Sequence, residues 1–149
     1  SGAGVGLAQY TTAGTVETAY INMTDTSNGV SLVSPIDGSV QITNAGLYTI
    51  IFSLQLVNAG NAYDDAQVWI RVNGTNVPYS MSRSTISQSH ASVPGSYLMC
   101  VNLFYTFAAN DILEIRWTNN SSFTAVTTYP ATNGIPAAPA VILTLQQIG

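Results

Sequence analysis

The sequence predicts an all-β protein, a jelly-roll sandwich of about ten antiparallel strands. Three observations predict it. Two long segments, residues 46–56 and 96–107, alternate between apolar and mixed side chains with a period of two, the repeat of a strand. Clusters of turn residues separate these segments from shorter alternating ones, as in sandwiches and barrels. No segment shows a convincing helical spacing of apolar residues.

The segment 46–56 is expected to be a central, buried strand. One of its faces is wholly apolar and consists of Tyr48, Ile50, Phe52, Leu54 and Leu56. The opposite face mixes Leu47, Thr49, Ile51, Ser53 and Gln55. Aromatic and β-branched residues fit such a half-buried, pleated surface. The mixed face is therefore available to water or to a partner.

The other strands are expected wherever the alternation returns between turn residues. They are residues 15–24, 30–33, 39–43, 66–72, 76–81, 112–118, 123–129 and 140–147. Asn73-Gly74 is a strong hairpin signal. Polar loops are expected at 58–65 and 82–95, and the prolines of 130–139 argue against a ladder there. Residues 1–14 are expected to be a flexible lead-in to a single jelly-roll domain over residues 15–149.

The composition narrows the possible partners. Charged residues make up 7% of the 149 residues, lysine is absent, and the formal net charge is −4. Nucleic-acid binding requires a basic surface, which three arginines cannot supply. No run approaches the roughly 20 apolar residues of a membrane span, so membrane insertion is not expected.

Catalytic chemistry finds no support in the sequence. Cys100 lies in an apolar strand pattern, which predicts a buried, inert thiol, and the sole histidine, His90, lies in a polar loop. No nucleophile elbow, phosphate-binding loop or set of metal ligands is present. We therefore expect no enzyme activity, no cofactor and no metal.

Four residues form the candidate ligand site. Tyr63 beside Asp64 and Asp65, together with Tyr129, would suit sugar recognition through an aromatic ring and carboxylate acceptors. Alternative interpretations remain open for both residue types. The tyrosines could instead pack under their own loops. The aspartates could instead be solvated, and a calcium site is not expected for them because such a site needs six to eight oxygen ligands.

Several motifs in order resemble those of C1q/TNF-like head domains. They are Gly46-Leu47-Tyr48 at the start of a long strand, the Val72-Asn73-Gly74 hairpin, Ala109-Asn110-Asp111 before a strand, and the final apolar strand from Val141 to Leu145. The resemblance covers residues 15–148. The proline-rich lead into Val141 and the sparse charge are similar to the versions found on phage virions.

The resemblance implies a homotrimer. In that family the first, third, sixth and last major strands form an inner sheet, whose outer face meets the neighbouring chains. On this basis the expected trimer interface comprises Trp69, Arg71, Glu114, Arg116, Ile142 and Thr144. The alternative is that this face is merely solvated.

The expected role is therefore a non-enzymatic, extracellular virion domain, the homotrimeric head of a phage fibre or of a capsid decoration protein. Its expected partners are copies of itself, other virion proteins, and a host-surface glycan or protein. Two alternatives stay open: a secreted C1q/TNF-like receptor ligand, and a carbohydrate-binding module attached to an enzyme.

Overall fold

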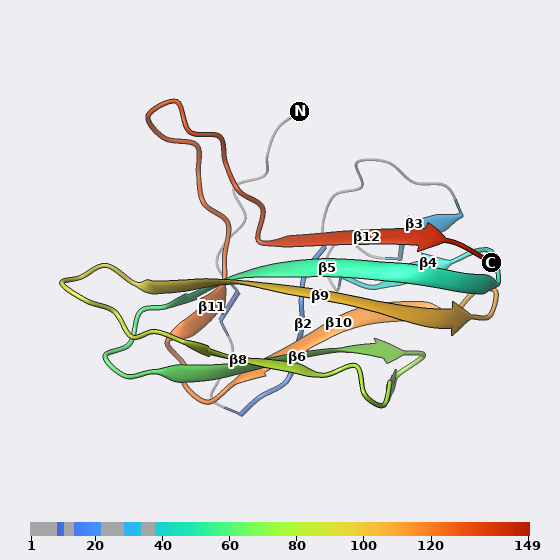
Figure 1. Ribbon diagram of the computed structural model, residues 1–149, viewed down its shortest axis with the longest axis horizontal. Coiled ribbons are helices and arrows are strands. Elements are labelled where there is room, and N and C mark those ends of the chain that lie inside the picture. Colours follow the sequence, from blue (N-terminus) through green and yellow to red (C-terminus); the bar gives the residue numbers. More distant parts are fainter. Residues whose placement is uncertain (1–8, 11–13, 22–28, 34–37) are drawn as a thin grey trace.

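The computed structural model describes residues 9–10, 14–21, 29–33 and 38–149, and within these ranges the chain is all β with no helix (Figure 1). Its strands are β1 (Gln9–Tyr10), β2 (Glu17–Thr18), β3 (Val30–Leu32), β4 (Val40–Ile42), β5 (Gly46–Asn58), β6 (Asp64–Val72), β7 (Thr75–Asn76), β8 (Ser82–Ile86), β9 (Gly95–Phe107), β10 (Ile112–Asn119), β11 (Thr124–Val126) and β12 (Val141–Gln147). All of their pairings are antiparallel. The predicted all-β fold class is confirmed.

Sheet A consists of β1, β5, β9, β11 and β12, with β5 at its centre. On one side β5 pairs with β9 along its whole length, from Gly46 opposite Phe107 to Asn58 opposite Gly95. On its other side β5 pairs with β12 and then with β11, so these two strands follow one another along the same edge. The short strand β1 pairs with β11.

Sheet B consists of the other seven strands and lies against sheet A. Its central strands are β10 and β6, which pair over seven residues, with Glu114 opposite Arg71 and Arg116 opposite Trp69. The strands β4 and β2 pair with the other edge of β10, and β8 and β7 pair with the other edge of β6.

The core fills the space between the two sheets. Ile50, Phe52 and Leu54 of β5 are at most 1% exposed, and Ile70 and Trp117 of sheet B are equally buried. This result confirms residues 46–56 as a buried strand. Burial of each such side chain contributes about 1.5–3 kcal/mol to stability, so the alternation of these strands accounts for the sandwich.

The structure differs from the predicted strands at the edges. The expected loop at 82–95 contains β8, because Ser82–Ile86 pairs with β6 and buries only Ile86. An edge strand with one buried side chain leaves no apolar alternation in the sequence. The expected first strand at 15–24 is reduced to Glu17–Thr18 within the described residues, and Gln9–Tyr10, expected in the lead-in, forms β1.

The segment between β11 and β12 forms a hairpin that stands out from the sandwich (Figure 1). We call residues 129–139 the hairpin arm. Backbone hydrogen bonds join Tyr129 to Ala138 and Thr132 to Ile135 as two isolated bridges, and no continuous ladder forms, as the prolines predict. Asn133 and Gly134 have positive φ values of 50° and 77°, as a two-residue hairpin turn requires. None of the three prolines is a member of either rung, and Pro130 and Pro136 lie between the two rungs.

Candidate functional site

The outer face of sheet B carries most of the charge of the described residues. Five charged side chains point outward from its strands, namely Asp65, Arg71, Arg83, Glu114 and Arg116. Glu17 lies in β2 at the edge of the same sheet. All three arginines of the chain are therefore in sheet B.

A hydrogen-bonded network on this face begins at Glu114. The guanidinium of Arg71 donates from Nε to Oε1 at 3.1 Å and from Nη2 to Oε2 at 2.7 Å, a bidentate pair. The Thr18 hydroxyl donates to Oε2 at 2.9 Å and accepts a short hydrogen bond from Arg116. All of these groups belong to one chain, so the network is complete without a partner.

The network also shifts two pKa values. Burial acts to raise the pKa of Glu114, but the hydrogen bonds from Arg71 and Thr18 outweigh it and hold that pKa below its usual value. Burial and the nearby Arg71 charge lower the pKa of Arg116. Both shifts follow from placing three charges in a half-buried cluster.

The second ion pair of this face joins β8 to β6. Arg83 donates a short hydrogen bond to Asp65, and the Thr85 hydroxyl donates to the same carboxylate at 2.8 Å. These two hydrogen bonds lower the pKa of Asp65. The pair is exposed, so screening by solvent limits its contribution to stability.

The outer face of sheet A has the opposite character. The residues that point outward from its three long strands include no Asp, Glu, Lys, Arg or His. They are Leu47, Thr49, Ile51, Ser53, Gln55 and Val57 of β5, Ser96, Leu98, Cys100, Asn102, Phe104 and Thr106 of β9, and Ile142, Thr144 and Gln146 of β12. We call this set the uncharged face.

Large apolar side chains are exposed on the uncharged face. Phe104 is 64% exposed, Leu98 55%, Ile142 51% and Ile51 39%. Phe104 lies opposite Thr49, and Ile51 lies between Asn102 and Thr144. Ile51 is therefore a diagonal neighbour of both Phe104 and Ile142. Large apolar side chains that are exposed together on one face favour an interaction site there.

The area of the uncharged face is of the order that a protein interface requires. The strands β5 and β9 each have 13 residues, and β12 has 7. With a rise of about 3.3 Å per residue and a spacing of about 4.8 Å between strands, the three strands cover roughly 500 Å² before side-chain relief is counted. A stable protein–protein interface buries about 800 Å² on each partner, which is of the same order.

The six expected interface residues do not share one face. Trp69 and Arg71 lie on β6, and Glu114 and Arg116 lie on β10, all on the outer face of sheet B. Only Ile142 and Thr144, which lie on β12, belong to the uncharged face. The grouping of all six on one surface is therefore wrong. Alternation along a strand shows which residues share a face of that strand, but it does not show which sheet the strand joins.

The expected ligand site is also divided by the structure. Asp64 is 3% exposed and accepts hydrogen bonds from the Asn120 backbone N–H, from Ser121 Oγ and from Thr124 Oγ1. It is thus a structural residue that holds the turn between β10 and β11. Asp65 pairs with Arg83, as described above. Asp64 is therefore enclosed by its own chain, and Asp65 is already paired with Arg83.

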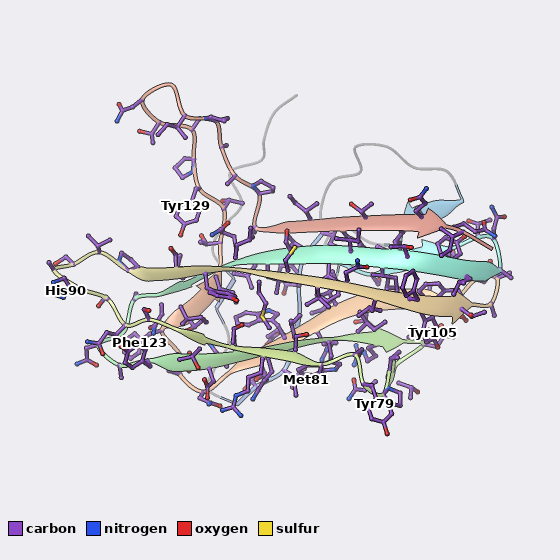
Figure 2. All side chains as sticks on the ribbon, viewed as in Figure 1. Tyr79, Met81, His90, Tyr105, Phe123 and Tyr129 are labelled. Atoms are coloured by element: carbon purple, nitrogen blue, oxygen red, sulfur yellow. The ribbon has the colours of Figure 1, made fainter. Side chains whose placement is uncertain are left out.

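The two tyrosines of that expected site are exposed but belong to different parts of the chain. Tyr63 precedes β6 and is 69% exposed. Tyr129 is 38% exposed and lies at the base of the hairpin arm (Figure 2). The alternative for both tyrosines is that they pack beneath their own loops, and Tyr63 does not do so.

Cys100 is exposed, so the prediction of a buried thiol is wrong. Its cross-strand neighbour is Ser53, and both point away from the core on the uncharged face. The apolar residues around it in the sequence are of two kinds: Met99 and Val101 are buried, whereas Leu98 faces outward. His90 is exposed, as expected.

Among the described residues, no group of three or more His, Cys, Asp or Glu side chains is close enough to hold a metal ion. The same residues include no helix of the length and apolarity needed to cross a membrane. No protein-family model matches the chain. A search of curated proteins also finds no match.

Proposed function

We propose that this domain is a non-enzymatic, self-associating head that forms a homotrimer through the uncharged face of sheet A. The observation that carries the proposal is the separation of charge between the two outer faces. Sheet B binds its own charges in closed networks, whereas sheet A exposes Phe104, Leu98 and Ile142 among neutral polar residues. A face without charges loses no ion solvation when a second chain covers it.

The composition of sheet A supports a trimer in particular, through the resemblance to C1q/TNF-like heads. The last strand of the chain, β12, lies in sheet A together with β5 and β9, and the resemblance implies that the last strand belongs to the inner sheet. The outer face of sheet A is the uncharged face. The expected trimer is therefore retained as a proposal, with a different set of interface residues.

The proposed biological setting follows from the resemblance to phage versions of such heads. In that setting the trimer is the tip of a fibre or a decoration protein of a capsid, and it binds a host surface or stabilises the particle. A secreted receptor ligand would share the same trimer. The carbohydrate-binding module is less well supported, because Asp64 and Asp65 are engaged within the chain.

Oligomeric state tests the proposal. Analytical ultracentrifugation of the full chain at micromolar concentration is expected to give three times the monomer mass of 15.7 kDa. Phe104→Glu replaces the most exposed large apolar side chain of the uncharged face, on β9, by a charge and is expected to yield folded monomers. The matched control is Gln67→Glu on the outer face of sheet B, which should remain trimeric. A monomeric parent chain, or a trimeric Phe104→Glu variant, would overturn the proposal.

A further inference from the structure

The hairpin arm has a surface that suits a protein partner. Residues 129–139 include no charged side chain, and all of them except Ala138 are exposed. Ile135, beside the turn, is 63% exposed. In the part of the chain that the structure describes, no hydrogen bond or ion pair links the residues between the two rungs of the arm to the sandwich. An apolar side chain held away from its own core gains free energy only when a partner covers it.

The backbone of the arm is also restricted at several points. Its two hydrogen-bonded rungs lie at the base and at the turn, and three prolines, Pro130, Pro136 and Pro139, restrict the backbone around them. Proline lowers the entropy of the free chain, and a preorganised segment loses less entropy on binding. The same prolines lack a backbone N–H, which reduces the capacity of the arm to pair with other strands.

The position of the arm indicates which partner it meets. It connects β11 to β12, two strands that lie on one edge of sheet A. Figure 1 shows it rising past the β12 side of that sheet, away from β9. The arm therefore starts at the border of the uncharged face, and a chain that covers this face lies within its reach.

We propose that the hairpin arm of each chain packs on the uncharged face of the next chain in the trimer, with Ile135 among its exposed apolar side chains. This inference rests on the proposed function, because it requires the trimer. Both surfaces are uncharged, so their contact leaves no charge unpaired. Each chain then donates one arm and receives one, the head-to-tail arrangement that closes a ring of three.

Two arm variants of the full chain test the inference through the trimer–monomer dissociation constant. Ile135→Asp is expected to weaken each arm contact by about 10- to 100-fold, the loss that corresponds to one buried isoleucine. Because a trimer has three such contacts, its dissociation constant into monomers should rise by about 10³- to 10⁶-fold. A second variant, in which residues 130–137 are replaced by Asn-Gly, removes the arm and should weaken the trimer at least as much. The control is Ser122→Asp, an exposed position in the turn between β10 and β11, which should leave the constant unchanged.

A cross-linking measurement identifies the surface that the arm contacts. A photoreactive benzoylphenylalanine at position 135, in trimers mixed from light and heavy-isotope chains, should cross-link to β5, β9 or β12 of another chain. Cross-links confined to the same chain, or directed to sheet B, would overturn the inference. So would arm variants that keep the parent dissociation constant. If either result overturns the inference about the arm, a trimeric parent and a monomeric Phe104→Glu variant would still support the proposed function. A monomeric parent chain would overturn both the inference and the proposed function.

Discussion

We predict that Asp64 stabilises the turn between β10 and β11. Its carboxylate is 3% exposed and lies at the start of β6. It accepts hydrogen bonds from the Asn120 backbone N–H at 3.1 Å, from Ser121 Oγ at 3.1 Å and from Thr124 Oγ1. Replacement by alanine removes all three bonds at once and leaves the donors of the turn without their acceptor.

The expected magnitude follows from these three bonds. A hydrogen bond contributes about 1 kcal/mol net to stability, and more where the acceptor is charged, so Asp64→Ala should cost about 3 kcal/mol. For a chain of 149 residues, an unfolding entropy of about 2.1 cal/mol/K per residue converts this loss into a melting temperature lower by about 10 °C. Asp64→Asn keeps one acceptor oxygen and should lose less.

Differential scanning calorimetry at one fixed protein concentration measures the effect, because assembly makes the melting temperature depend on concentration. Asp65→Ala is the matched control. It removes the next carboxylate, which points outward and pairs with exposed Arg83, so its effect should be much smaller. An Asp64→Ala melting temperature equal to that of the parent would refute the structural role. Calcium that stabilises the parent but not this variant would instead assign Asp64 to a ligand site.

Three further predictions concern other elements. Tyr79 is fully exposed and has a φ of 62° (Figure 2). Asparagine tolerates this conformation, so Tyr79→Asn should relieve about 1 kcal/mol of strain and raise the melting temperature by about 3 °C. A melting temperature below that of the parent would contradict the strain. A Cβ at Gly95 would lie 1.8 Å from the Ser87 backbone oxygen. Gly95→Ala should therefore lower the free energy of unfolding, measured in urea, by about 1–3 kcal/mol. An unchanged urea midpoint would argue against this close approach. The folded-state pKa of Glu114 lies below the unfolded value of about 4.5, so its contribution is present above that pH and is lost as the pH falls through the folded value. Glu114→Gln should therefore be less stable at neutral pH and lose less stability on acidification, and parallel pH curves for the two proteins would contradict this.

The sequence predicted the long strands well because their burial is periodic. The alternation of Ile50, Phe52 and Leu54 with less apolar residues directly predicts which side chains are buried in the core. It could not predict β8, since Ile86 is the one buried side chain of that strand, nor the pairing in the arm, where proline obscured the Asn133-Gly134 hairpin signal. Propensity is weakest where neighbouring strands, and not the segment itself, decide the structure.

The candidate site was predictable only in part, for a related reason. The uncharged residues of 46–56 were recognised as a face open to a partner, but Trp69 and Arg71 were grouped with Ile142 although they lie on different sheets. Likewise, Asp64 and Asp65 are neighbours in the sequence and point in opposite directions. A single step along a strand reverses the side chain, so one carboxylate is buried and the other is exposed.

By itself, the sequence determined that this chain folds into strands, which side of each long strand is apolar, and that charge is too scarce to cover the surface. Only the tertiary structure decided how the strands divide between two sheets. That division places the described charges of the strands on sheet B and leaves the outer face of sheet A without any. The physical reason is that alternation is a local property, whereas strand pairing joins residues far apart in the chain.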